Sequence, residues 1–341
     1  MKKFTSCLTL LLVFLILSIS SSEAATEITS LPYTINSPGS YYITKDLSST
    51  KHGIIVNKNH VTIDLRGHSI KGSSSGGYHG IYMNGRTNVE IKNGTIRNFG
   101  LNGIYEESDS GNSHRIINVR VIGNKGYGIC LDGNNHLIEA CTVSYNGSYG
   151  IYVGNGSKVS SNTVYSNEGY GIYVGDRSTV FSNTVFENGD IGIYAADGST
   201  VSGNTVSDNG CSGIRTSTGC TISNNTADFN GSASNCLFSG KYGIYTAGGA
   251  TIINNTVRGN EGDGVFTSGG SIVIGNTASY NNGDGINTED GCTVKNNASY
   301  YNQNYGIELG AYNLVDGNTA YNNNTNIKTC ATCTFGTNCA P

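Results

Sequence analysis

The sequence predicts an all-β fold: a single right-handed parallel β-helix, or solenoid, built from coils of 21 residues. A repeat of that length runs through most of the chain, and each repeat holds short apolar segments separated by turn residues. Gly is frequent, with 48 residues, and Pro is rare, with 3. Because Gly and Asn both tolerate positive φ, a chain rich in these residues is expected to contain many tight turns.

Each repeat begins with a Gly that is followed by Ile or Val. The commonest spacing between these pairs is 21 residues, whereas 30 residues separate Gly213 from Gly243. Longer spacings indicate loops inserted into a repeat architecture. The pairs begin at Gly80, Gly103, Gly128, Gly150, Gly171, Gly192, Gly213, Gly243, Gly264, Gly285 and Gly306.

Two Asn positions keep step with the repeat. Twelve residues after each Gly, from Gly150 onward, stand Asn162, Asn183, Asn204, Asn225, Asn255, Asn276, Asn297 and Asn318. Seventeen residues after it stand Asn167, Asn188, Asn209, Asn230, Asn260, Asn281, Asn302 and Asn323. A buried polar group needs a hydrogen-bond partner, and stacked coils would give each Asn the next Asn as partner. We therefore expect two structural Asn ladders.

Each repeat contains three segments of strand length, such as the alternating stretch from Ile151 to Val153, and no helical periodicity. Strands this short are not stable alone. Stacked coils solve this, because each strand then bonds to its equivalents in the neighbouring coils at a spacing of about 4.8 Å.

The expected organisation is a signal peptide at 1–24, an N-terminal cap at 25–52, β-helix repeats at 53–326 and a Cys-rich C-terminal cap at 327–341. Lys2 and Lys3 precede an apolar stretch that is too short for a comfortable membrane span. We therefore expect a secreted protein, extracellular or periplasmic, with no transmembrane span after signal removal. The net charge is −4 and no basic run occurs, so no nucleic-acid partner is expected.

Three stretches resemble right-handed parallel β-helix repeat proteins of the pectin-lyase-like superfamily: Val61–Gly72 (VTIDLRGHSIKG), Asn88–Tyr105 (NVEIKNGTIRNFGLNGIY) and the repeated NNT…GI units. The resemblance extends from about Tyr33 to the C-terminus. It implies the fold, but relatives include lyases, hydrolases, epimerases, tailspikes and adhesins, so it does not fix the function.

The catalytic motifs of these enzymes are absent. There is no Asp-Asp pair, and the only prolines are Pro32, Pro38 and Pro341, which leaves no Arg-x-Pro-x-x-Arg or Asp-Pro-His-Asp motif. Only Met83 remains in the mature chain, which argues against a copper-related role. No catalytic residue can be assigned from motifs.

A column of aromatic residues is the main candidate for a binding site. Two residues after the repeat Gly stand Tyr82, Tyr105, Tyr152, Tyr173, Tyr194 and Tyr245, followed by Phe266. Because the preceding Ile faces inward, these rings should face outward. We assign carbohydrate binding to Tyr152, Tyr173, Tyr194 and Tyr245. The alternative is a self-stacking ladder that stiffens the coils.

Two polar groups are weaker candidates. The first is an acid–base group in the irregular early coils, formed by His79, Arg97, Glu106, Glu107, His114 and Arg120. The second is a pair of stacked carboxylates, Asp176 with Asp197 or Asp263 with Asp284, which Ca²⁺ could neutralise. Two carboxylates do not specify a metal site, so no metal and no other cofactor is predicted.

Nine cysteines remain in the mature chain, and an odd number leaves at least one thiol free or paired between chains. Cys236, in the insertion before Gly243, could reach Cys211, and Cys330, Cys333 and Cys339 crowd the last coil. We expect disulfides here and no metal ligands.

Three functions remain open. The first is a secreted protein that binds polysaccharide or surface glycan through the Tyr column and does not catalyse a reaction. The second is a divergent polysaccharide lyase, hydrolase or epimerase, and the third is a structural or adhesive rod. We expect any groove wall at the insertions Ser108–Asn112 and Ser232–Lys241. The oligomeric state is not predicted.

Overall fold

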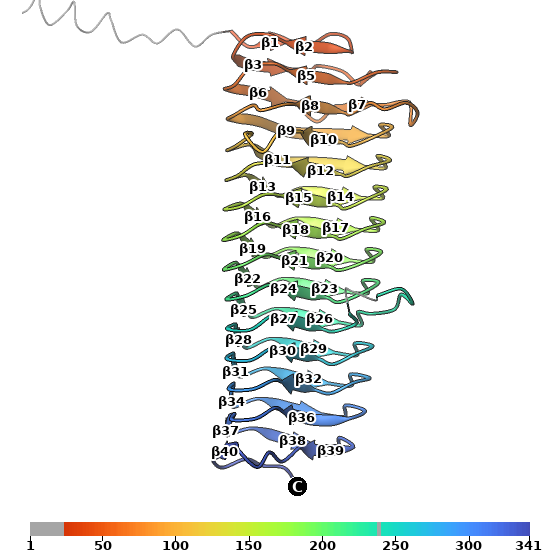
Figure 1. Ribbon diagram of the computed structural model, residues 1–341. Coiled ribbons are helices and arrows are strands. Elements are labelled where there is room, and N and C mark those ends of the chain that lie inside the picture. Colours follow the sequence, from red (N-terminus) through yellow and green to blue (C-terminus); the bar gives the residue numbers. More distant parts are fainter. Residues whose placement is uncertain (1–23, 237–239) are drawn as a thin grey trace, which may run out of the picture.

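The computed structural model describes residues 24–236 and 240–341. Over these residues the chain contains no helix and winds into a single parallel solenoid whose coils are stacked along one axis (Figure 1). The predicted all-β solenoid is therefore confirmed. The predicted signal peptide lies outside the described residues except for Ala24. None of the described residues forms a helix long and apolar enough to span a membrane.

One strand from each coil joins a sheet of 14 strands, here called sheet B. Its members are β2 (Tyr33–Ile35), β5 (Ile54–Val56), β8 (Ile81–Met83), β10 (Ile104–Glu106), β12 (Ile129–Leu131), β15 (Ile151–Val153), β18 (Ile172–Val174), β21 (Ile193–Ala195), β24 (Ile214–Thr216), β27 (Ile244–Thr246), β30 (Val265–Thr267), β33 (Ile286–Thr288), β36 (Tyr305–Leu309) and β39 (Thr325–Ile327).

The other strands form a sheet of 26 strands, sheet A, which consists of two ladders. Two long strands run through both ladders and join them: β9 (Val89–Arg97) and β11 (Arg115–Ile122). The first ladder also holds β1 (Thr26–Glu27), β3 (Gly39–Tyr42), β6 (Val61–Asp64), β13 (Leu137–Glu139), β16 (Lys158–Ser160), β19 (Thr179–Phe181), β22 (Thr200–Ser202), β25 (Thr221–Ser223), β28 (Thr251–Ile253), β31 (Ile272–Ile274), β34 (Thr293–Lys295), β37 (Leu314–Asp316) and β40 (Thr334–Phe335). The second also holds β4 (Leu47–Ser48), β7 (Ser69–Lys71), β14 (Thr142–Ser144), β17 (Thr163–Tyr165), β20 (Thr184–Phe186), β23 (Thr205–Ser207), β26 (Thr226–Asp228), β29 (Thr256–Arg258), β32 (Thr277–Ser279), β35 (Ala298–Tyr300) and β38 (Thr319–Tyr321).

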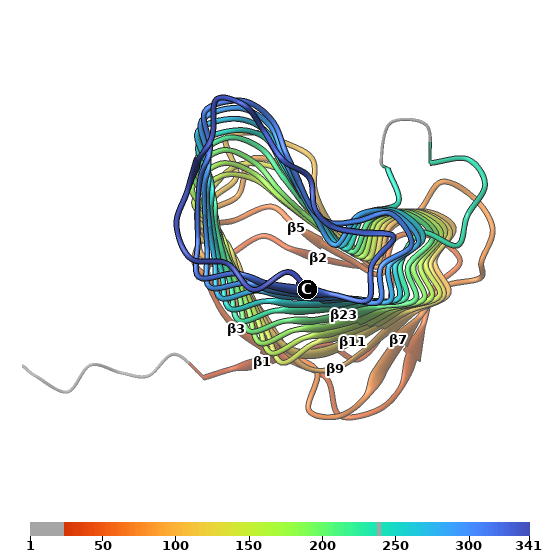
Figure 2. The ribbon, with the colours of Figure 1, turned by 90° about the horizontal axis from the view of Figure 1, so that it is seen from below.

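The register places each residue beside its equivalent in the next coil. In sheet B, Ile151 pairs with Ile172, and Ile172 pairs with Ile193. Every pairing between named strands is parallel, as expected when one chain winds repeatedly in the same direction. Figure 2 looks along the stack and shows the coils superimposed, with β2 and β5 of sheet B on one side and β7, β9 and β11 of sheet A on the other.

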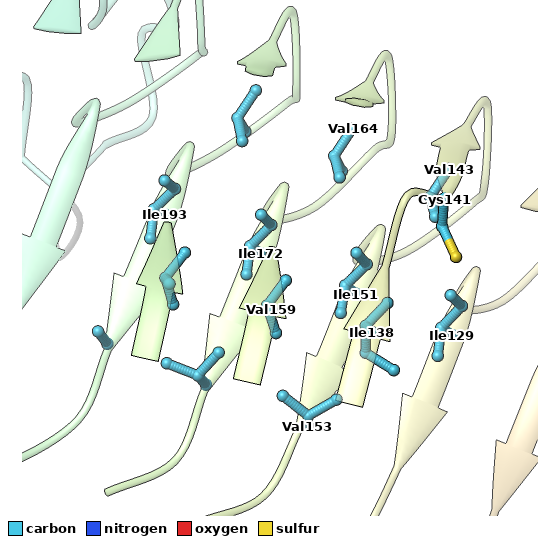
Figure 3. Close-up of a cluster of buried hydrophobic side chains, with 14 of the residues drawn as sticks. Ile129, Ile138, Cys141, Val143, Ile151, Val153, Val159, Val164, Ile172 and Ile193 are labelled. Atoms are coloured by element: carbon cyan, nitrogen blue, oxygen red, sulfur yellow. The ribbon is translucent and has the colours of Figure 1, made fainter. Parts of the chain in front are cut away.

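The core is a continuous stack of β-branched side chains. Ile151, Val153, Val159 and Val164 point inward from the three strands of one coil, and each is fully buried (Figure 3). Equivalent residues repeat in the coils on either side. The alternation of apolar and polar residues within each short strand therefore sets which face of the strand lies inside.

The repeat Gly is required by the close approach of neighbouring coils. A Cβ atom on Gly171 would lie 2.6 Å from the carbonyl oxygen of Gly192 and 2.5 Å from a methyl group of Val185. No side chain can occupy that space without moving the backbone of the next coil. The Gly-Ile pair thus identifies the point where sheet B begins in each coil.

The two predicted Asn ladders are present and buried, at the turns on either side of the second ladder of sheet A. The side-chain oxygen of Asn188 accepts hydrogen bonds from the backbone N–H (3.2 Å) and the side-chain amide (2.9 Å) of Asn167. The amide of Asn167 also donates to the carbonyl of Val143 in the preceding coil. Each Asn therefore links three successive coils and satisfies turn groups that no strand pairs.

A third buried ladder, which the sequence did not reveal, begins with two histidines. The backbone N–H of His114 donates to Nδ1 of His136, and the backbone N–H of His136 donates to the Ser157 hydroxyl. Ser178 and Ser199 continue the same position. Because Nδ1 of His136 accepts a backbone N–H, and its Nε2 lies 3.2 Å from the Asp132 carbonyl, the ring must be neutral.

Both ends of the predicted repeat region are extended by further coils. The N-terminal residues expected to form a cap already make a coil, since β2 pairs with β5 and β3 pairs with β6. At the C-terminus β40 pairs with β37, and Asn338 accepts the last bonds of one Asn ladder.

The predicted bond between Cys211 and Cys236 is present, with a Cα–Cα distance of 5.5 Å. It ties the insertion that follows Asn230 to the preceding coil. A second disulfide joins Cys330 and Cys333, while Cys339 is free and exposed. The thiols of Cys130, Cys141, Cys220 and Cys292 are free and buried.

We predict that Asn204→Ala destabilises the protein by about 3 kcal/mol, because it removes the buried acceptor of the backbone N–H and side-chain amide of Asn183 and the amide that donates to the Val180 carbonyl. Urea unfolding of the purified protein measures this. Thr205→Ser, at the exposed neighbouring residue, is the control and should change the stability little. Equal stability of the two variants would show that the ladder does not stabilise the stack.

We also predict that acid destabilises the fold through its buried histidines. Burial and the neighbouring His114 lower the pKa of His136 to about 3, and burial lowers the pKa of His79 to about 4. Between pH 6.5 and these values the unfolded chain binds protons that the folded chain does not, so stability falls as the pH falls.

His136→Ser is the matched variant, because serine already occupies this ladder position in later coils. It should lose about 3 kcal/mol less stability than the wild type between pH 7 and pH 4, measured by urea unfolding at each pH. The same loss in both proteins would show that His136 does not cause the acid sensitivity.

Candidate functional site

The outer surface of sheet B carries the predicted aromatic column. Strand pairing sets Tyr152 beside Tyr173 and Tyr173 beside Tyr194, and ring centroids in both pairs are 4.9 Å apart. Tyr245 stacks on Phe266 further along, with centroids 5.3 Å apart. The column is half-buried and faces away from the Ile and Val core.

A second row of rings lies beside this column. Tyr127, Tyr149, Tyr170 and Tyr242 each stand directly before a repeat Gly, and Tyr149 stacks on Tyr170 at 4.5 Å. Tyr149 also approaches Tyr173 of the first row, with ring centroids 6.4 Å apart. The sequence contained this signal, a Tyr-Gly pair at the repeat spacing, but only the first row was singled out.

Stacking determines which part of each ring a ligand can reach. The planes of Tyr152, Tyr173 and Tyr194 are within 14° of parallel, so both faces of the middle ring are covered by its neighbours. What remains accessible is the ring edge with its hydroxyl group. The column therefore stiffens the coils and at the same time presents a row of phenol groups.

Several of these hydroxyls have no partner among the described residues. Tyr194 bonds to Ser217 at 3.0 Å and Tyr82 bonds to Glu107. In contrast, the hydroxyls of Tyr149, Tyr152 and Tyr173 make no hydrogen bond to any described residue. Burial raises the pKa of Tyr149 and Tyr152 to about 12, so these groups stay protonated and can donate.

Two residues interrupt the first row. Cys130 lies between Tyr105 and Tyr152 in the register, and Arg215 lies between Tyr194 and Tyr245. The Arg215 guanidinium sits 4.3 Å above the Tyr245 ring, so the arginine continues the stack.

The insertion closed by Cys211–Cys236 packs against the rows. The disulfide forms a small apolar cluster with Ile191, against which Tyr170 and Tyr194 pack. The other insertion, Ser108–Asn112, folds against Glu106, whose carboxylate accepts the Ser108 backbone N–H. That either insertion walls a groove remains a prediction, and residues 237–239 lie outside the described chain.

The predicted acid–base group does not assemble, which corrects that expectation. Glu106 and His114 do meet, at 3.3 Å, but both side chains are fully buried. Burial raises the pKa of Glu106, yet hydrogen bonds from His114 and from backbone N–H groups outweigh it, and the net pKa is lowered. The pair braces a turn and no substrate can reach it.

The other members of that group lie elsewhere. His79 stacks on Tyr105, 4.6 Å between centroids, on the sheet B side. Glu107 bonds to Tyr82 and Asn84. Arg97 and Arg120 belong to β9 and β11 of sheet A, on the other side of the coils (Figure 2). The early coils contain insertions of unequal length, so these residues do not recur at a constant repeat spacing. The sequence therefore could not show which of them lie close together.

The stacked carboxylates form a polar cluster at the C-terminal end of the aromatic rows. The Asn287 side-chain amide donates to Asp263 (3.2 Å), Asp284 (3.1 Å) and Glu308 (3.2 Å), while Lys328 pairs with Glu308. Burial, together with the hydrogen bond to Glu308, raises the pKa of Asp284 to about 7. An open hollow of about 570 Å³ adjoins this polar cluster and is lined in part by Asn287, Glu308 and Lys328.

The other predicted carboxylate pair, Asp176 and Asp197, lies in turns. Asp197 accepts the backbone N–H of Thr218, and Asp176 lies one coil away from it. Within 24–236 and 240–341 no three His, Cys, Asp or Glu side chains come close enough together to hold a metal ion.

Solved structures with the same architecture include polysaccharide-modifying enzymes. A double mutant of the periplasmic alginate epimerase AlgG superimposes with a TM-score of 0.56 at 16% identity, over 92% of this chain and 85% of that one. The A-module of the mannuronan C-5 epimerase AlgE4 from Azotobacter vinelandii gives 0.55 at 16% identity, over 88% and 91%. Likeness at such low identity shows the fold alone.

Sequence comparison identifies the family of this chain but no individual relative. No curated protein matches the chain. A family model described as "Right handed beta helix region" matches residues 44–179, 102–249 and 227–340, which together span most of the sequence. The chain therefore belongs to the right-handed β-helix family.

Proposed function

We propose that this is a secreted protein, extracellular or periplasmic, that binds extracellular or cell-surface carbohydrate along the outer face of sheet B and does not act on it chemically. The observation that carries the proposal is the pair of tyrosine rows whose hydroxyls, at Tyr149, Tyr152 and Tyr173, have no partner within the described chain. Self-stacking explains the rings but leaves these hydroxyls unexplained.

A repeating ligand suits a repeating surface. Successive coils present the same phenol group at the strand spacing of about 4.8 Å, so an extended sugar chain could meet equivalent groups coil after coil. Tyrosine combines an apolar ring edge with a polar tip, and sugar rings likewise present both C–H and hydroxyl groups. The carbohydrate-modifying neighbours with the same fold are compatible with this partner, although they establish only the fold.

The absence of catalysis is supported by the missing enzyme motifs and by the burial of Glu106 and His114, the one acid–base pair that the expected group forms. The disulfides between Cys211 and Cys236 and between Cys330 and Cys333 support an oxidising compartment, in agreement with the signal-like N-terminus.

A second candidate, a divergent polysaccharide lyase, hydrolase or epimerase, is favoured by Asp284. A carboxyl group with a pKa of about 7, which accepts a hydrogen bond from Asn287 in the wall of an open hollow, is suited to proton transfer at neutral pH. Incubation of any bound polymer with the protein, followed by analysis of chain length and sugar epimers, tests this. Turnover that Asp284→Asn abolishes would replace the binding proposal by the enzymatic one.

The binding proposal predicts that Tyr173→Phe weakens glycan binding about tenfold, because it removes one hydrogen-bonding hydroxyl and keeps the stacked ring. The measurement is affinity for the best ligand found on a broad glycan array that includes uronate polymers.

Tyr165→Phe is the matched control, since Tyr165 stacks on Phe186 of sheet A, away from the proposed site. Its affinity should equal that of the wild type. If no glycan binds, or if the two variants bind alike, the tyrosine rows belong to the scaffold of a structural or adhesive rod.

A further inference from the structure

Positively charged side chains that are far apart in the sequence gather on the outer face of sheet A in the early coils. Lys71 at the end of β7 pairs in register with Arg97 at the end of β9. Arg120 of β11 follows one coil later, beside Thr95. All three point away from the core, and Lys71 and Arg120 are exposed. The chain as a whole carries a net charge of −4, so this concentration is local.

The three cations line adjoining hollows. One hollow of about 440 Å³ and another of about 350 Å³ share Gly67, Thr95 and Arg120 in their walls, so they form one groove. A hollow of about 550 Å³ contains Lys71 and Lys51, next to the register partner Arg97. Gly67 keeps the groove open, because a side chain there would stand in empty space and its φ of +83° favours glycine.

One carboxylate, Asp46, shares the groove with these cations and attracts Arg97 electrostatically, which leaves a net positive charge on the lining. The acidic residue of the lining, Asp46, accepts the backbone N–H of Ser69 at 2.8 Å and faces His68 at 3.8 Å. Within the described chain, Lys71, Arg97 and Arg120 form no ion pair. Nearby Arg115 differs, because it is paired with Glu90 at 3.1 Å.

We propose that this groove binds the acidic groups of an anionic polysaccharide, which deepens the carbohydrate proposal by naming the ligand class and a second site. A guanidinium presents a planar fork of donors that matches a carboxylate or sulfate group. Between the cations, the hydroxyl of Thr95 and the amides of Asn98 and Asn118 offer partners for sugar hydroxyls.

The same features argue against a nucleic acid. Sites for single strands combine cations with aromatic side chains on which bases stack, and no aromatic residue lines these three hollows. Duplex binding uses a larger basic surface than three unpaired cations supply.

The test compares wild type with the double variant Arg97→Gln/Arg120→Gln in binding to a soluble polyuronate, a sulfated polysaccharide, an uncharged glucan and DNA. The wild type should bind the acidic polymers, the uncharged glucan more weakly, and DNA least. Its affinity for the acidic polymers should fall as salt is raised. The double variant should bind the acidic polymers at least tenfold more weakly and with a smaller salt dependence.

Arg115→Gln is the matched control for the single variant Arg120→Gln, because it removes one charge from the same strand but from an existing ion pair. It should bind like the wild type. The two acidic polymers distinguish carboxylate from sulfate as the recognised group. Preference for DNA, equal binding of the uncharged glucan, or equal loss in Arg115→Gln would each overturn the proposal.

This outcome is separable from that of the tyrosine rows. If the proposal about the groove is wrong but the protein does bind carbohydrate, Tyr173→Phe still weakens glycan binding while the double arginine variant does not. Thermal unfolding of the Arg97 and Arg120 variants should be unchanged, since the replaced side chains point away from the core and form no ion pair with any described residue. The single variant Arg120→Gln repeats the test if the double variant is unstable.

Discussion

The buried hydrogen bonds between asparagines of successive coils are the interaction on which the rest of this structure depends. Strands of three residues offer few backbone bonds each, and the turns between them expose polar groups to an apolar interior. The ladders through Asn167 and Asn183 satisfy those groups and link each coil to both neighbours. They also fix the register, because a shift of one residue would leave every ladder bond unmade.

A fixed register turns sequence periodicity into surface chemistry. Any residue type repeated at the coil length becomes a column, as with Tyr152, Tyr173 and Tyr194 on sheet B. The same register brings together residues with no visible relation in the sequence, such as Lys71, Arg97 and Arg120 on sheet A. The two faces thus offer different chemistry, hydroxyl-rich on one side and cationic on the other, on one rigid scaffold.

Sequence reasoning succeeded where the repeat is regular. The solenoid, both Asn ladders and the Cys211–Cys236 bond followed from spacing, since a single coil length determines which residues meet. It failed where coil length varies or where residue types alternate. The ladder that begins at His114 and His136 continues as serine, so no single residue type marks it. The early insertions hid that Glu106 meets His114 in the core and that Arg97 lies on the opposite sheet.

Hydrogen exchange at the backbone amides of the ladder asparagines tests the central claim most directly. Asn167, Asn188 and Asn209 lie in turns, outside the strands, where amides ordinarily exchange quickly. In this account their N–H groups donate to a buried side-chain oxygen in the next coil, so they should be protected as strongly as the amides of the neighbouring strands. Exchange at the rate of exposed turns would contradict the claim that these bonds hold the coils in register.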